Sequence, residues 1–156
     1  MFLPRLGYSR IIFCGEAWGE RMDRVAYDQY LEHFNARNYE AVLAYYAPRF
    51  EITFAGYSLR TREEVRAFYT FLHQYVRESI VVHAFVSSSS MVALEARVRL
   101  EGLRTLTPQA ARDAGFERLM VPAVAEVVEI PQFIHYHLED GKIVKAVCAV
   151  FEPSKS

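Results

Sequence analysis

The sequence predicts an α+β domain in which a curved antiparallel sheet closes over helices to form a cone-shaped α+β barrel. Helical patterns come first: two occupy residues 27–47, and a third begins at a capping box from Thr61 to Glu64. Four strand patterns fill most of the chain after residue 80. Helices followed by antiparallel strands form layered α+β domains. A strongly bent sheet covered by one long N-terminal helix leaves a conical cavity, where a small apolar ligand would bind.

Composition limits the classes of function. The 156 residues are 52% hydrophobic, which is enough for a single domain with a substantial core. Eighteen basic and nineteen acidic residues give a net charge of −1, and this balance argues against binding to nucleic acid or to an anionic membrane. Cys14 and Cys148 match no metal-ligand spacing and suggest no disulfide framework, so the cytoplasm is the expected compartment.

The first helix is expected to start at Asp23, which would cap it. Tyr27, Tyr30 and Phe34, together with Leu31, fall at helical spacing and form one apolar face. Residues 1–21 lack this periodicity, and their apolar pieces are too short for a signal peptide. They are interpreted as an N-terminal extension that the fold does not need.

A second helix is expected from Tyr39 to Ala47, ended by Pro48, followed by a strand over residues 50–54. The helix that starts at the capping box should run to about Arg77. Strands are then expected at 80–87, 91–101, 127–138 and 142–151.

Within the last pair of strands, Glu139-Asp140-Gly141 predicts a tight hairpin, and Pro131 predicts an edge position or a bulge. Residues 102–126 form the least regular part, an insertion with a short helix after Thr107-Pro108.

Two segments carry a resemblance to a known family. Tyr46–Phe54 reads YAPRFEITF, and Glu139–Ile143 reads EDGKI. With the order of elements, they resemble the nuclear transport factor 2-like (NTF2-like) superfamily and, within it, the SnoaL-like polyketide cyclase and scytalone dehydratase group. The resemblance implies a single SnoaL-like domain over residues 22–153, a homodimer, and a cavity used either for catalysis or for ligand binding.

Positions known from the family's enzymes carry over unevenly. Tyr30 falls on the oxyanion-hole tyrosine of ketosteroid isomerases, but their catalytic acids fall on Phe54 and Ile134. Of the limonene-epoxide hydrolase set, the arginine falls on Arg97 while its two acids fall on Arg99 and Cys148.

The match to scytalone dehydratase is better. Its strand histidine falls on His83 and a substrate-binding asparagine on Gln132, while its substrate-activating tyrosines fall on Phe34 and Phe54.

His83 is the residue that the resemblance favours as proton carrier. An imidazole can take and return a proton near neutral pH, as isomerisation, dehydration and cyclisation all require. The alternative is a half-buried strand histidine bonded to a neighbouring carbonyl group.

The strand at 91–101 poses a second choice, because its two faces differ completely. One face is apolar, and the other carries Glu95, Arg97 and Arg99. Binary patterning would turn these charges to water. The family alignment instead turns them into the cavity, where Glu95 or Arg97 would hold the tautomer or charge of His83. The apolar face would then pair with a second subunit through Val92, Leu94, Val98 and Leu100, with Phe133 nearby.

The same alignment turns His135 and His137 outward and Gln132, Ile134 and Tyr136 inward, so a metal site is not expected. The resulting hypothesis is a cofactor-independent acid–base enzyme, an isomerase, cyclase or dehydratase. It would act on a small polycyclic or aromatic oxygenated molecule, with His83, Glu95 and Arg97 catalytic. The predicted substrate-binding residues are Tyr30, Phe34, Phe54, Arg99, Gln132, Ile134 and Tyr136. The alternative is a non-catalytic ligand-binding or dimerising domain of the same fold.

Overall fold

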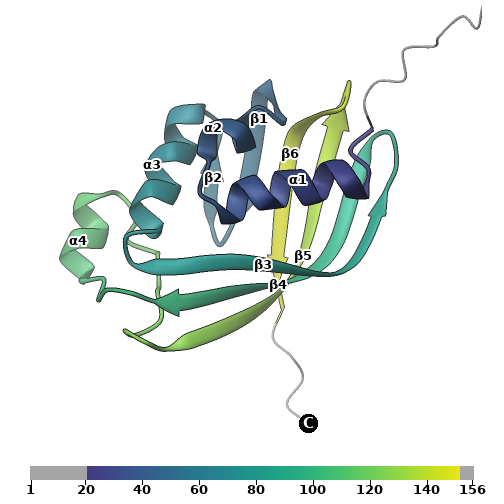
Figure 1. Cartoon of the computed structure of the whole chain (residues 1–156). Coiled ribbons are helices and arrows are strands. Elements are labelled where there is room, and N and C mark those ends of the chain that lie inside the picture. The colour runs from purple at the N-terminus through teal and green to yellow at the C-terminus, as the bar shows by residue number, and fades with distance from the viewer. Residues whose placement is uncertain (1–20, 152–156) are drawn as a thin grey trace, which may run out of the picture.

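A computed structural model describes residues 21–151 and shows a curved six-stranded sheet with helices on one face (Figure 1). The helices are α1 (Arg24–Asn35), α2 (Tyr39–Leu43), α3 (Arg62–Leu72) and α4 (Pro108–Asp113). The strands are β1 (Tyr46–Phe54), β2 (Tyr57–Leu59), β3 (Val76–Ser87), β4 (Met91–Gly102), β5 (Val127–Glu139) and β6 (Lys142–Val150). The proposed extension therefore lies outside the described residues, apart from Arg21.

The cone-shaped α+β architecture predicted from the sequence is confirmed. The strand order is β2-β1-β6-β5-β4-β3, so the sheet stays open between β2 and β3. All pairs are antiparallel except β1 with β6, which run parallel. Figure 1 shows α1, α2 and α3 together on one side of the sheet, with α4 at the end of β4 that lies far from the β3–β4 turn.

Local capping explains where the helices begin. The Asp23 carboxylate accepts a hydrogen bond of 2.9 Å from the backbone N–H of Ala26, as expected for the cap of α1. At α3, Thr61 and Glu64 form both halves of the predicted capping box.

The predicted end of the second helix is wrong. The helix ends at Leu43, and β1 begins at Tyr46, so Pro48 lies inside a strand. It occupies an irregular stretch where the register with β6 shifts, between the pairs Tyr46–Ile143 and Glu51–Lys145. A proline is tolerated there because the interrupted ladder does not require its missing N–H.

Two further boundaries differ from the expectation. The third helix ends at Leu72 and β3 begins at Val76, four residues before the predicted strand. β2 is absent from the predicted strands, and it pairs with β1 across Ala55 and Gly56, whose φ angles are 46° and 80°. Positive φ at both central residues is typical of a two-residue hairpin turn.

The last hairpin is confirmed. Asp140 and Gly141 have φ angles of 48° and 72° between β5 and β6. Pro131 lies at an edge, as predicted: β6 pairs with β5 only from Gln132 onward, and the Pro131 carbonyl accepts a bond from Phe151 N–H. The proline nitrogen therefore faces the side where β6 ends, beyond the last ladder pair, Gln132–Val150.

The two faces of β4 follow binary patterning, so their predicted assignment is wrong. Val92, Leu94 and Val98 are only 0–4% exposed, whereas Glu95 and Arg97 are exposed. The helices cover the concave face (Figure 1), and burying several charges there without partners would be costly. The apolar residues proposed for the subunit interface therefore belong to the core.

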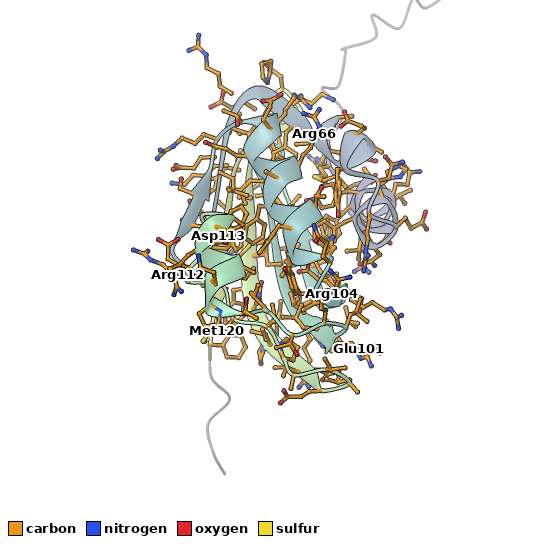
Figure 2. All side chains as sticks on the ribbon, turned by 90° about the vertical axis from the view of Figure 1, so that its left-hand side faces the viewer. Arg66, Glu101, Arg104, Arg112, Asp113 and Met120 are labelled. Atoms are coloured by element: carbon orange, nitrogen blue, oxygen red, sulfur yellow. The ribbon has the colours of Figure 1, made fainter. Side chains whose placement is uncertain are left out.

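The insertion over residues 102–126 packs against α3. Phe116 lies edge-on against Phe68, with ring centroids 5.2 Å apart. Figure 2 shows α4 beside α3, with Arg112, Asp113 and Met120 on its outer side. The insertion is thus an integral layer of the fold.

The insertion approaches the sheet closely at Gly102, and this contact gives a prediction. A Cβ atom at Gly102 would lie 2.0 Å from the carbonyl oxygen of Ala123. Gly102→Ala should therefore push the following turn away and lower the free energy of unfolding in urea by about 1–3 kcal/mol. Thr105→Ala, an exposed site in the same insertion, is the control and should leave it unchanged. Equal stability of both variants would show that the turn moves without cost.

Candidate functional site

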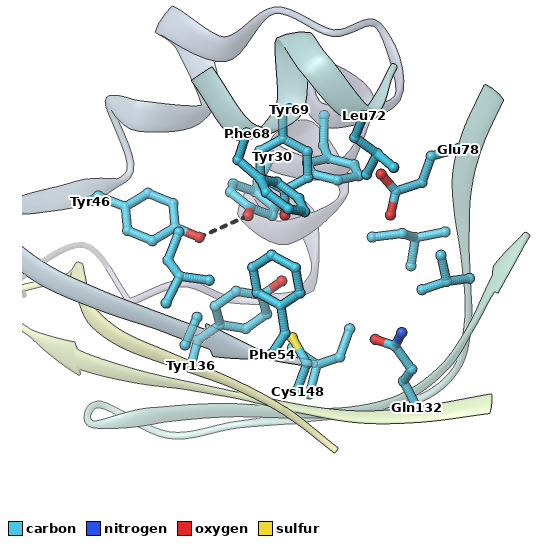
Figure 3. A pocket seen from close by; sticks show the side chains of 16 residues that line it. Tyr30, Tyr46, Phe54, Phe68, Tyr69, Leu72, Glu78, Gln132, Tyr136 and Cys148 are labelled. Carbon is cyan, nitrogen blue, oxygen red and sulfur yellow. Dashed lines mark hydrogen bonds between the residues drawn. The ribbon is translucent and has the colours of Figure 1, made fainter. Parts of the chain in front are cut away.

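A cavity of about 80 Å³ lies between the helices and the concave face of the sheet (Figure 3). Its lining is mainly aromatic and aliphatic, and it consists of Tyr30, Phe34, Tyr46, Ile52, Phe54, Phe68, Tyr69, Leu72, Glu78, Ile80, Val98, Gln132, Ile134, Tyr136, Ala146 and Cys148. The volume is smaller than the roughly 300–1,000 Å³ of pockets for drug-sized ligands. It favours a small, compact molecule over a polycyclic one.

Three tyrosines form one end of this cavity. The hydroxyls of Tyr30 and Tyr46 are 3.1 Å apart, and the Tyr136 ring meets Tyr30 edge-on at 5.8 Å. Burial raises the pKa of Tyr30 to about 12, although hydrogen bonds from Tyr46 and Tyr136 oppose the rise. Burial also raises the pKa of Tyr46 and of Tyr136 well above the usual value. All three are therefore neutral hydroxyls at neutral pH and can donate to a ligand oxygen.

Tyr27, which lies on α1 with Tyr30, packs behind this group of three tyrosines. Its ring lies 5.7 Å from that of Tyr30 and 5.9 Å from that of Tyr136. Its hydroxyl is buried and has no hydrogen-bond partner among residues 21–151, and burial raises its pKa. The tyrosine end is thus rich in hydroxyl groups held by packing.

Glu78 and Gln132 line the cavity on the other side, away from Tyr46 and Tyr136 (Figure 3). The Glu78 Oε2 atom is 2.9 Å from His73 Nε2, and the two side chains are 11% and 4% exposed. On the far side of the imidazole, Nδ1 is 2.6 Å from the Tyr39 hydroxyl. A hydrogen-bonded chain of three side chains therefore ends in the cavity at a carboxylate.

Local structure explains this placement. Val76, Glu78 and Ile80 alternate on the inward side of β3, so the strand period itself points the carboxylate toward the cavity. His73 is the C-cap of α3, five residues earlier, and the guanidinium of Arg37 donates to the carbonyls of His73 and Val76 at 3.3 Å each. The link between helix and strand is thereby fixed.

Sequence reasoning missed both Glu78 and His73. The available signal was the parity of Glu78, which alternates with the apolar Val76, Ile80 and Val82. The expectation that the helix continued to Arg77 concealed that alternation.

Six of the seven predicted substrate-binding residues line the cavity: Tyr30, Phe34, Phe54, Gln132, Ile134 and Tyr136. The seventh, Arg99, does not, and its guanidinium lies 3.5 Å from the Glu101 carboxylate. His135 is exposed on the outer face, as the resemblance implied.

The three predicted catalytic residues do not line the cavity. His83 is exposed at an irregularity of β3, between the pairs Val82–Ala96 and Ala84–Glu95. Such a bulge leaves the extra residue unpaired and turns it out of the alternation. Glu95 is exposed on the convex face, and Arg97 pairs there with Glu129 at 3.2 Å. Their placement in the cavity is therefore wrong, and a catalytic role for His83 has no support from its position.

The described part of the chain holds no group of three or more residues of the metal-ligating types close enough to bind a metal ion. Within residues 21–151, no helix has the length and apolar character to span a membrane. The cavity lining given above has one carboxylate and no lysine or arginine. Its chemistry is thus a proton-accepting carboxylate opposite neutral hydroxyl donors, suited to an uncharged oxygen-bearing ligand.

Comparison with known proteins supports the fold described above. Residues 27–146 match the family model of the SnoaL-like domain. The chain matches no curated protein sequence.

Three solved structures illustrate the likeness in fold. An NTF2-like protein of unknown function from Burkholderia pseudomallei is 15% identical, with a TM-score of 0.63 over 81% of this chain and 88% of that one. A candidate polyketide cyclase from Silicibacter sp. TM1040 is 18% identical, with a TM-score of 0.66 over 81% and 87%. Another candidate polyketide cyclase, from Xanthomonas campestris, is 22% identical, with a TM-score of 0.61 over 78% and 84%. At these identities the likeness establishes the fold.

Cys148 provides a chemical test of the cavity. Burial, together with the charge of Glu78, raises the pKa of its thiol to about 12. Because the thiolate is the reactive form, labelling by a disulfide reagent at pH 8 should be about 10²–10³-fold slower in the folded protein than in denaturant. The measurement uses Cys14→Ser protein, so that only Cys148 reacts. Equal rates in the folded and unfolded protein would show that this thiol ionises normally.

Proposed function

Because the chain belongs to the family of SnoaL-like domains, we propose that it is a cofactor-independent acid–base enzyme acting on a small oxygenated molecule. The observation that carries the proposal is the Glu78 carboxylate, held by His73 and facing an otherwise uncharged cavity. Carboxylates in such sites remove protons from carbon in isomerisation, cyclisation and dehydration. In this proposal Glu78 takes the place that sequence reasoning gave to His83.

In the proposed reaction the ligand oxygen lies at the tyrosine end. Tyr30 and Tyr136 donate hydrogen bonds to it, so negative charge that develops on the oxygen is stabilised. Glu78 removes a proton from a neighbouring carbon and returns it to another position. Gln132 offers both an N–H donor and a carbonyl acceptor for a second polar group of the ligand.

The volume of the cavity favours a single-ring or open-chain carbonyl compound over a polycyclic one. The likeness to candidate polyketide cyclases from two bacteria supports the class of reaction.

Proton exchange tests this proposal without knowledge of the natural substrate. The protein should speed exchange of the α-protons of a small ring ketone, such as cyclohexanone or 2-cyclohexenone, in D₂O, followed as loss of the ¹H NMR signal. Glu78→Gln keeps the shape but removes the base, so the catalysed rate should fall about 10²–10⁴-fold.

Glu95→Gln, an exposed carboxylate on the convex face, is the matched control and should keep the full rate. His83→Ala should keep it as well. If Glu78→Gln were as active as the parent protein while His83→Ala lost activity, the proton carrier would be His83 after all.

A binding domain is the second candidate, favoured by the mutual hydrogen bonding of Tyr30 and Tyr46, which leaves fewer groups free for a ligand. It predicts that ring ketones raise the thermal midpoint of the protein but that no exchange is catalysed. The two measurements together separate the candidates.

We also propose a homodimer through the convex face of the sheet, with Phe133 retained from the predicted interface and the buried β4 residues left out. Phe133 is 46% exposed and stacks on Phe151 at 4.7 Å, and Val86 is 67% exposed on the same face. Ala84 and Ala93 belong to the same surface, on which Glu95 lies next to Phe133 and His135 next to Ala93. An apolar patch of this kind is typical of a subunit contact.

Sedimentation should therefore report a dimer at micromolar concentration, and Phe133→Glu should convert it to a monomer because a charge would be buried in the contact. Val25→Glu is the control: Val25 is 66% exposed but lies on α1, on the other side of the sheet. A parent protein that sediments as a monomer would contradict the proposal.

A further inference from the structure

The hydrogen-bonded chain of Tyr39, His73 and Glu78 joins three elements, α2, the end of α3 and β3. Its inner end, Glu78 Oε2, is bound to His73 Nε2, whereas Oε1 accepts no hydrogen bond from a described residue. The two carboxylate oxygens are therefore inequivalent. One is held by the protein, and the other remains available in the cavity.

The proton positions in this chain follow from what each group can donate. An ionised carboxylate only accepts, so a proton must lie on His73 Nε2. If the imidazole is neutral, its Nδ1 is then an acceptor, and the Tyr39 hydroxyl donates to it at 2.6 Å.

The same hydrogen-bond partners, Glu78 and Tyr39, also fit a protonated and therefore charged imidazole at His73. In that state Nδ1 carries a proton as well and must donate to the Tyr39 oxygen. The Tyr39 hydroxyl has a second acceptor ready, because the backbone carbonyl oxygen of Tyr69 lies 3.3 Å away. By turning its proton between the two acceptors, Tyr39 accommodates both charge states of His73 without movement of heavy atoms.

Other groups complete the surroundings of the pair. The rings of Phe34 and Tyr69 pack against the imidazole, with centroids at 6.4 Å and 5.6 Å. Arg37, which follows α1, lies next to the His73–Glu78 pair because its guanidinium donates a hydrogen bond to the backbone carbonyl of His73. The polar side chains that line the cavity with Glu78 are all neutral and include Tyr30, Tyr69, Gln132 and Cys148.

We propose that His73 is the positioning residue of Glu78: it holds Oε2 and so makes Oε1 the atom that accepts the proton. This rests on the proposed function. The orientation is the same in both charge states, because Nε2–H is present in each. The basicity of Glu78 is not the same, since a carboxylate beside an imidazolium is a weaker base than one beside a neutral imidazole. The rate of catalysed exchange should therefore increase with pH as His73 loses its second proton. At the same time the hydroxyl proton of Tyr39 turns from the carbonyl oxygen of Tyr69 to His73 Nδ1.

The first arm of the test needs no ligand. Titration of the histidine side chains by NMR follows the full-length protein, and the signal of His73 is assigned by its absence in His73→Gln. In Glu78→Gln the titration of His73 should change, because the carboxylate charge next to the imidazole is lost. An unchanged titration would overturn the proposal. Exposed His135 serves as the internal control and should titrate identically in both proteins.

The second arm separates positioning from a merely structural role. His73→Gln retains an N–H donor that can reach Oε2 but cannot titrate. It should keep exchange within about tenfold of the parent and lose the increase with pH that His73 causes. His73→Leu removes the donor, and its exchange rate should fall to within about tenfold of the Glu78→Gln rate. A pH profile in His73→Gln like that of the parent would contradict the proposal. If neither the parent protein nor any variant catalyses exchange, the proposed function is wrong. The histidine titration still decides, independently, whether His73 and Glu78 are paired.

Discussion

The packing of the aromatic face of α1 against the concave side of the sheet is the contact on which the rest of the structure depends. Tyr27, Tyr30 and Phe34 are all buried there, and they meet aromatic residues from the sheet and from α3. A curved sheet has one concave face, and covering it with a helix excludes water from the space between them. The cavity is the part of that space that side chains do not fill, so its position is set by the same contact that stabilises the fold.

Because the helices cover the concave face, the charged side chains of the sheet lie mainly on its other face. On β4 the apolar residues face α1 and the charged ones face outward, because each unpaired charge under the helices would carry a desolvation cost. Glu78 is the exception on the concave face, and it is tolerated because His73 supplies a hydrogen bond and can supply a compensating charge. A single paired carboxylate in so apolar a site is more easily explained by chemistry than by stability, since paired ionic groups contribute little to stability when buried.

Much of this could be predicted from residues that act locally. The cap at Asp23, the capping box at Thr61 and the Asp140-Gly141 turn each depend on neighbours within a few residues, and each is present. The failures depend on longer-range geometry. The face of β4 was assigned from distant relatives, and in a strand a displacement of one residue reverses every side chain. His83 was displaced by a bulge that no local signal marks, and Glu78 was hidden by a misplaced boundary between helix and strand.

The polarity of the cavity limits the charge of the ligand that it can bind. Its hydroxyl donors are neutral because burial raises the pKa of each tyrosine, and no cationic side chain lines it among the described residues. An anionic ligand would meet the Glu78 carboxylate with no opposite charge in the wall to offset the repulsion. A neutral carbonyl compound avoids that cost when it binds and becomes anionic only after Glu78 has taken its proton and become neutral. The net charge inside the cavity is then the same before and after the transfer, so an apolar wall can host the reaction without solvation by water.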